Sequence, residues 1–353
     1  METVLTIIQG KGTLPREQAG RNIHYDDASL ANYKKVEQGD FIIHLRSFEG
    51  GLEMANEDGI VSPAYTILRC KKPHSSLFYE AYFHTDEFIN HILSKSVEGI
   101  RDGRQISYEA FKWLGLPYCD VSEQERIAQL FCTLSHRIEK QQQMVDALKK
   151  YKRGLLNQIF SAISKGSQRR KLRELVHVSG GKTPSMSNSL YWNGDIVWIS
   201  SKDMKSSRIS GSELKITNLA LNEMTLYHPG TLLLVARSGI LKHSLPLAIL
   251  EVDATINQDI KALQVHGCNA FYLYYAILSQ EDNIIRTLVK TGTTVQSLMM
   301  DSFLNIEIPT PNIDQQQSII DKLAKLEKYV DVQGKELSLL SQMRNGLLQQ
   351  LFI

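Results

Sequence analysis

The chain contains one segment twice, and this internal repeat constrains its fold more than any other feature. Residues 121–160 align with residues 313–352 without a gap, and ten of the forty aligned positions are identical. The first copy ends in RGLLNQIF at 153–160, and the second ends in NGLLQQLF at 345–352. Self-similarity of this kind indicates that one structural unit is used twice in the chain.

Both copies have apolar residues at alternating spacings of four and three, which is the pattern of a coiled-coil seam. A glutamine and a basic residue interrupt each seam at matching positions, Gln141 and Lys152 in one copy and Gln333 and Arg344 in the other. We therefore expect two long helices that pack against each other, although two amphipathic helices packed on separate domains would be a simpler reading. The seam residues predicted to make this contact are Ile127, Leu134, Gln141, Leu148, Leu155, Ile319, Leu326, Gln333, Leu340 and Leu347.

The stretches before the two helices also match, more faintly. Gly39 and Gly230 each precede a short run of strand-forming residues, and Arg46 and Arg237 each follow their glycine by seven positions. Each repeat unit is therefore predicted to be a mixed α/β domain followed by a long helix. The expected boundaries are 1–120 for the first domain, 121–160 for the first helix, 161–311 for the second domain and 312–353 for the second helix.

The two domains are predicted to differ in size. The repeat period is 192 residues but the first helix pattern ends at 160, so the first domain has no counterpart of about residues 161–192. We expect the first domain to be short at its N-terminal side, and to lack one or two strands and one loop.

Composition and motifs give no sign of an active site. Four cysteines lie far apart without a C-x-x-C pair, which suits a reducing cytoplasm, and no apolar run has the length of a membrane span. The GGKT stretch at 180–183 lacks the earlier glycine of a phosphate-binding loop. The chain has neither an H-E-x-x-H metal motif nor a G-x-S-x-G nucleophile turn, and no Asn-Pro-Pro methyltransferase motif follows FEGG at 48–51. We expect no cofactor, no metal and no catalysis.

The order of these parts resembles the DNA-specificity subunit of type I restriction–modification enzymes. Two diverged domains alternate with two long helices, each helix closes on GLLxQxF, and the second domain carries GGKTPS at 180–185 and YWNGDIVWISSKDM at 191–204. The resemblance implies an α/β fold class, with two mixed α/β target-recognition domains in a pseudo-twofold arrangement, separated by two long antiparallel coiled-coil helices. Each domain would read one half of a bipartite DNA site.

The resemblance also implies partners. These are double-stranded DNA, methyltransferase (M) subunits, which we expect to number two, and restriction–translocation (R) subunits that join through the complex. The subunit itself would be non-catalytic. Two other readings stay open at this point: a partial specificity gene product that serves as a recombination reservoir, and a coiled-coil scaffold unrelated to DNA.

Contacts to DNA come from basic and polar side chains. Arg46 and Arg237 are the strongest candidates because both follow a strand at a matched offset, although an arginine at a strand end often forms only a surface ion pair. The full set of predicted DNA-binding residues is Arg46, Arg101, Arg104, Lys182, Lys202, Arg237, Thr293, Thr294 and Gln296.

Overall fold

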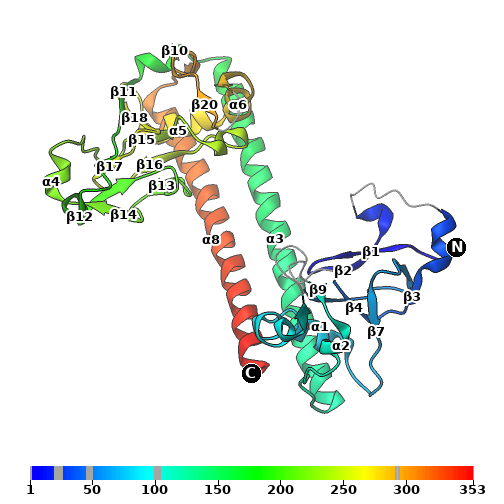
Figure 1. Ribbon diagram of the computed structural model, residues 1–353. Coiled ribbons are helices and arrows are strands. Elements are labelled where there is room, and N and C mark those ends of the chain that lie inside the picture. Colours follow the sequence, from blue (N-terminus) through cyan, green and yellow to red (C-terminus); the bar gives the residue numbers. More distant parts are fainter. Residues whose placement is uncertain are drawn as a thin grey trace. The chain divides into compact units, whose positions relative to one another are not determined.

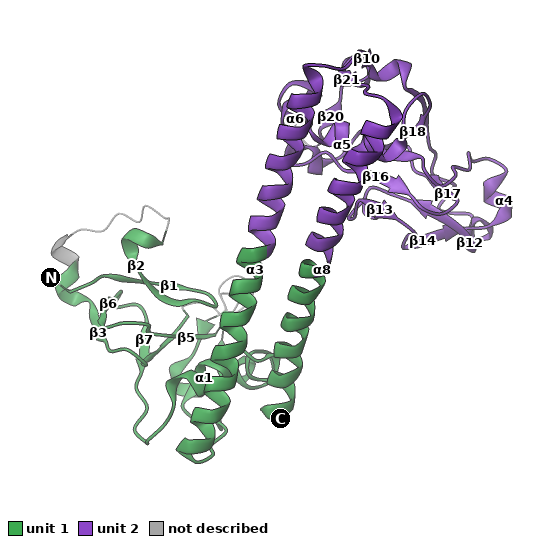
Figure 2. Cartoon of the chain, turned by 180° about the vertical axis from the view of Figure 1, so that it is seen from behind, with its two compact units in different colours: residues 1–144, 333–353 green, residues 145–332 purple. Residues whose placement is uncertain are grey.

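The computed structural model describes residues 2–19, 27–44, 51–98, 105–290, 292 and 295–352. The chain divides into two compact units (Figure 2): unit 1 comprises residues 1–144 and 333–353, and unit 2 comprises residues 145–332. Each unit contains one globular α/β domain together with one end of both long helices. The predicted mixed α/β fold with two long helices is confirmed (Figure 1).

Unit 1 is built on a small antiparallel sheet of order β5-β4-β7. Three further strand pairs, β1–β2, β3–β6 and β8–β9, surround it in the described part of the unit. Its strands are β1 (Leu5–Ile8), β2 (Gly12–Pro15), β3 (Lys34–Val36), β4 (Phe41–Ile43), β5 (Leu52–Met54), β6 (Gly59–Val61), β7 (Thr66–Leu68), β8 (Val97–Glu98) and β9 (Gln105–Ile106). Its short helices are α1 (Ser76–Phe83) and α2 (Tyr108–Phe111), with a π-helical segment at Glu87–Ile92.

Unit 2 contains a five-stranded sheet of order β11-β18-β15-β16-β13 and a three-stranded sheet of order β14-β12-β17. Its strands are β10 (Arg169–Lys171), β11 (Val176–Gly180), β12 (Trp192–Ile199), β13 (Arg208–Ile209), β14 (Leu214–Ile216), β15 (Leu232–Val235), β16 (Leu247–Leu250), β17 (Ala254–Ile256), β18 (Ile260–Val265), β19 (Val289–Lys290), β20 (Ser297–Leu298) and β21 (Glu307–Pro309). Its short helices are α4 (Asn218–Leu221), α5 (Ala270–Leu278), α6 (Glu281–Leu288) and α7 (Met300–Phe303).

The faint similarity between the two domains corresponds to shared topology. Gly39 and Gly230 have backbone φ angles of +92° and +88°, a region that glycine enters without steric cost. Each precedes the middle strand of its sheet, β4 or β15, and each middle strand has two antiparallel neighbours. Strands β7, β4 and β5 therefore correspond to β18, β15 and β16. Among the described residues, the sheet of unit 1 has no strand that flanks these three as β11 and β13 do in unit 2.

The repeated segments form the long helices α3 (Val121–Ser164) and α8 (Ile313–Leu351). Helix α3 continues past the predicted end at residue 160. All ten predicted seam residues lie on the buried or half-buried face of their helix, and none is exposed.

The two helices contact each other within each unit, and they run in opposite directions. In unit 1, the Gln141 side-chain amide donates to the carbonyl and side-chain oxygens of Gln333 at 3.0 and 2.9 Å. The rings of Phe131 and Phe352 stack there with centroids 6.1 Å apart. Between these two contacts the residue numbers decrease along α3 and increase along α8, so the helices are antiparallel. In unit 2, the ammonium of Lys152 pairs with Glu327. Two of the four polar interruptions of the seam are thus hydrogen-bonded to each other.

The matched helix endings explain why the sequence repeats GLLxQxF. Leu156 and Phe160, near the end of α3, are buried in the core of unit 2, where Phe160 packs on Tyr272 of α5 at 5.5 Å between centroids. Leu348 and Phe352, near the end of α8, are buried in the core of unit 1, where Phe352 packs on Phe78 of α1 at 5.1 Å. Each long helix thus starts from one domain and ends in the core of the other.

A buried glutamine fixes the start of each long helix in the same way. The Gln124 amide donates to the carbonyl of Cys119 and accepts from the N–H of Ser75, the residue that precedes α1. Gln316 donates to the carbonyl of Pro311 and accepts from the N–H of Asn269, the residue that precedes α5. All four of these distances are 2.9 Å. Both copies of the repeat therefore have glutamine at this position because it makes the same two hydrogen bonds in each unit.

Candidate nucleic-acid interface

One edge of unit 2 is formed by the ends of several strands. The C-terminal end of β11 meets the start of β18, since Gly180 pairs with Lys261, and the C-terminal end of β15 meets it from the other side, since Val235 pairs with Ile260. Strands β12 and β17 are parallel and end together at Ile199 and Ile256. We call this the strand-end edge of unit 2.

Residues 256–259 connect the loops of this edge. The carbonyl of Ile256 accepts from the N–H of Lys182 at 3.0 Å, and the N–H of Asn257 donates to Ile199, the last residue before the turn that contains Lys202. The carbonyl of Asp259 accepts from the N–H of Ala236, which precedes Arg237. The structure therefore brings Lys182, Lys202 and Arg237 to one edge, although 55 residues separate the first from the last in the sequence.

Only glycine fits at Gly181, the second residue of the GGKT loop, because the loop there passes close to a neighbouring backbone segment. A Cβ atom on Gly181 would lie 1.9 Å from the carbonyl oxygen of Ile256. Beyond this contact Lys182 is exposed, and its carbonyl oxygen accepts a hydrogen bond from the Trp198 indole at 3.1 Å. Gly181 therefore serves close packing of the loop, and Lys182 projects from a fixed backbone.

Asp203 holds the turn that presents Lys202. Its carboxylate accepts from the N–H and hydroxyl of Ser200 and from the N–H of Glu213. Burial alone would raise the pKa of Asp203, but these hydrogen bonds outweigh it and lower the pKa. Lys202 is exposed at the middle of the turn.

Arg237 and Gln296 lie next to each other at the same edge. Arg237 forms a backbone bridge with Ser297, and the carbonyl of Gln296 accepts from the N–H of Ser238 at 3.1 Å. The Arg237 side chain is exposed and makes no ion pair with any residue that the structure describes. The alternative interpretation, in which Arg237 forms a surface ion pair, is thus not supported by the described residues.

The other predicted DNA-binding residues lie outside the described residues: Arg46, Arg101, Arg104, Thr293 and Thr294. The strands on either side of the last four are described. Arg101 and Arg104 belong to the connection between β8 and β9, and Thr293 and Thr294 to the connection between β19 and β20. These two strand pairs occupy matching places in the repeat, so the predicted residues fall in equivalent connections.

Sequence reasoning missed Lys261. This residue is the second of β18 and pairs with Gly180, and a Cβ atom on Gly180 would lie 3.0 Å from the Lys261 ammonium. Lys261 stands within a strand pattern, where its charge resembles that of an ordinary surface lysine. The pairing of β11 with β18 places its charge at the strand-end edge.

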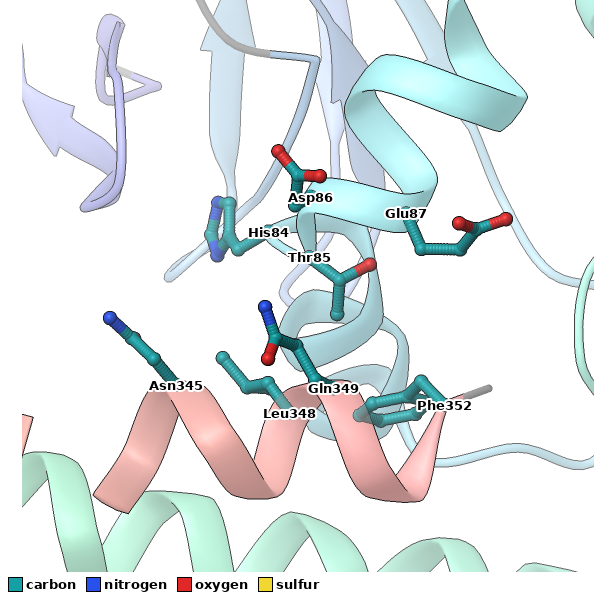
Figure 3. Close-up of a pocket in the computed structure, with 8 residues that line it drawn as sticks. All are labelled: His84, Thr85, Asp86, Glu87, Asn345, Leu348, Gln349 and Phe352. Atoms are coloured by element: carbon teal, nitrogen blue, oxygen red, sulfur yellow. The ribbon is translucent and has the colours of Figure 1, made fainter. Parts of the chain in front are cut away.

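Other kinds of site are less well supported. No group of three or more potential metal-binding side chains occurs among the described residues, and no helix in that part of the chain is long and apolar enough to span a membrane. Unit 1 contains a pocket of about 430 Å³ between α8 and the segment His84–Glu87 (Figure 3). Because Asp86 and Glu87 line this pocket, its charge is unfavourable for phosphate.

Comparison with known proteins identifies the family. Residues 164–342, about half of the chain, match the family described as the type I restriction modification DNA specificity domain. The chain is 32% identical over 252 residues to the type I restriction enzyme EcoR124I/EcoR124II specificity subunit of Escherichia coli, covering 68% of this chain and 62% of that protein. It is 30% identical over 190 residues to the type I restriction enzyme MjaIX specificity subunit of Methanocaldococcus jannaschii, covering 52% of this chain and 43% of that protein.

The chain thus spans less than two thirds of the length of these two curated relatives. Its fold is shared over most of its length with the S subunit of a type I restriction–modification system from M. genitalium. That crystal structure matches with a TM-score of 0.60 and 15% identity over 91% of this chain and 84% of the other. The resemblance seen in the sequence is confirmed, and the chain belongs to the family of type I restriction–modification DNA specificity proteins.

Proposed function

We propose that this chain is the sequence-reading subunit of a type I restriction–modification complex, that it recognises a bipartite, asymmetric DNA site, and that it acts in the cytoplasm. The observation that carries the proposal is the convergence of Lys182, Lys202, Arg237 and Gln296 on the strand-end edge of unit 2. Positive side chains gathered at one edge supply phosphate contacts, and a strand-end arginine can read guanine with two hydrogen bonds.

The proposal includes the boundaries 1–120 and 161–311 for two target-recognition domains, with each domain reading one half-site. The two domains differ in sequence and in the number of sheet strands described, so the half-sites are expected to differ as well. Methylation and cleavage would come from M and R subunits that dock on the chain, which itself has no catalytic role. The two helices 121–160 and 312–353 would set the distance between half-sites and provide docking surface.

The test is the pattern of methylated adenines in the host genome, with and without this gene. We expect a bipartite motif that disappears when the gene is deleted. The variant Arg237→Ala should relax the half-site read by the second domain and leave the other half-site intact, because a lost base contact costs about 1–3 kcal/mol of discrimination at its own position.

A matched control is Arg169→Ala. Arg169 lies on β10 in the same unit, its guanidinium pairs with Glu307 at 3.0 Å, and the strand-end edge does not include it. This variant should leave the motif unchanged. An equal loss of methylation at all sequences with Arg237→Ala would instead make Arg237 a backbone contact, and an unchanged motif after deletion of the gene would reject the proposed function.

A further inference from the structure

The turn between β1 and β2 in unit 1 has a counterpart at the strand-end edge of unit 2. Strand β6 follows the β4–β5 pair as β17 follows β15–β16. Val36, three residues before Gly39, pairs with Gly59 of β6, and Tyr227, three residues before Gly230, bridges Ala254 of β17. Strands β6 and β17 are therefore equivalent.

This equivalence extends to the segment that enters each turn. Strand β17 pairs in parallel with the end of β12, with Trp198 opposite Thr255. Strand β6 receives a parallel bridge from Val4 to Ile60, the residue equivalent to Thr255. The chain after Val4 thus occupies the place of the chain after Trp198, which leads into the turn containing Lys202.

The segments that leave the two turns also match. In unit 2 the chain returns as β13, parallel to β16. In unit 1 it returns as β2 beside β5, where the Thr13 hydroxyl accepts from the N–H of Asn56, two residues after β5 ends. The turn of unit 1 that corresponds to the Lys202 turn therefore contains Gly10, Lys11 and Gly12.

A carboxylate holds each of these turns. In unit 1 it is Glu53, which is only 1% exposed and accepts from the N–H groups of Gly10 and Gly12 at 2.7 and 3.0 Å. The Asn56 amide adds a hydrogen bond to the carbonyl of Lys11 at 2.7 Å. Both glycines have positive φ angles near +70°, and a Cβ atom on Gly12 would lie 2.6 Å from the carbonyl oxygen of Met54. The backbone on both sides of Lys11 is thus fixed by buried groups.

The Lys11 side chain itself is exposed, and it makes no ion pair with any residue in the described ranges. Placing a buried ionised glutamate under a turn is costly unless hydrogen bonds compensate it. Here the compensating hydrogen bonds from Gly10 and Gly12 order a turn from which the Lys11 side chain projects. A single ammonium that projects from a fixed backbone suits phosphate as its ligand. An ammonium binds phosphate as a point charge, and a contact of this kind does not distinguish one base sequence from another.

We propose that the Gly10–Gly12 turn binds the phosphate backbone of DNA through Lys11, as the first-domain counterpart of the Lys202 turn. This inference rests on the proposed function, since it assigns a contact within the same DNA complex. It adds to the first domain a contact that its predicted residues Arg46, Arg101 and Arg104 do not include.

The experiment measures the affinity of the full chain, in complex with its methyltransferase subunits, for duplexes of random sequence and for the methylated motif across a series of salt concentrations. Lys11→Ala should weaken binding to all duplexes alike and lower the slope of log affinity against log salt by about 1. Lys11→Arg should keep the slope. The control Lys35→Ala removes the same charge from an exposed Lys35–Glu2 pair on β3 and should leave the slope unchanged.

The outcomes separate this inference from the proposed function. If the wild-type complex binds its motif and Lys11→Ala keeps the wild-type slope, the Lys11 contact is rejected while the proposed function stands. If Lys11→Ala changes the preferred half-site and leaves the salt slope intact, Lys11 reads a base and the phosphate assignment is overturned. If the wild-type complex shows no preference for any sequence, the proposed function fails.

Discussion

At the scale of single residues, the buried carboxylate of Glu53 makes the stability of unit 1 depend on pH. Burial would raise its pKa, but the imidazoles of His44 and His84, 3.6 and 3.4 Å from the carboxylate, and the hydrogen bond from the N–H of Gly10 outweigh burial and lower its pKa to about 2. The ordinary glutamate pKa is 4.5. Because the folded-state pKa is the lower one, Glu53 stabilises the fold above pH 4.5, and this contribution is lost as the pH falls towards 2.

The contribution amounts to about 3 kcal/mol. We therefore expect Glu53→Gln to lower the free energy of unfolding at pH 7 by an amount of that order, and the difference from wild type to shrink as the pH falls through 4 to 2. Urea unfolding followed by circular dichroism at a series of pH values measures this. The surface variant Glu17→Gln should follow the wild-type curve. A difference between Glu53→Gln and wild type that is constant with pH would show that Glu53 acts through packing alone.

At the scale of elements, each long helix begins from one domain and ends in the core of the other, which we call crosswise packing. This packing makes opposite predictions for two matched phenylalanines. Phe160 of α3 is 4% exposed and Phe352 at the end of α8 is 8% exposed. Truncation of a buried phenylalanine to alanine costs about 3–5 kcal/mol. We expect Phe160→Ala to destabilise the second domain and Phe352→Ala to destabilise the first, although the helix that leads to each residue begins from the other domain.

Limited proteolysis with mass mapping of the first cleavage sites distinguishes these outcomes. Cleavage should begin within residues 171–311 for Phe160→Ala and within residues 1–120 for Phe352→Ala. Leu351→Ala is the control, since Leu351 is 42% exposed and adjoins Phe352. If each substitution exposes the domain that precedes its own helix, the crosswise packing is wrong.

The sequence predicted these elements better than their contacts. The alternating four and three spacing predicted α3 and α8, and Gly39 and Gly230 predicted the starts of β4 and β15, because periodicity and turn chemistry are local properties. The identity of Gln124 with Gln316 was visible, but not that each amide joins a helix start to the residue before α1 or α5.

The candidate site shows the same limit. Lys182, Lys202 and Arg237 were identifiable because each follows a strand or turn signal, whereas Lys261 and Lys11 gain their positions only through strand pairing. Pairing between strands distant in sequence depends on the complete sheet, so a pattern within one strand does not reveal which residues share an edge.

At the scale of the whole molecule, the charge balance limits how the chain binds DNA. With 40 lysines and arginines against 38 aspartates and glutamates, the formal net charge is only +2. Such a chain attracts DNA weakly at long range, and its affinity depends on local contacts such as those at the strand-end edge of unit 2.

We therefore expect the purified chain alone to bind DNA weakly and with a shallow salt dependence, and the complex with methyltransferase subunits to bind one bipartite site tightly and with a steeper one. Each added phosphate contact raises the slope of log affinity against log salt by about 0.9, so the difference in slope counts the contacts that the partner supplies. Filter binding of both samples to the same duplex, across salt concentrations, gives the two slopes. Equal slopes would mean that the chain makes all phosphate contacts itself, and the partner would then increase affinity only by ordering the chain.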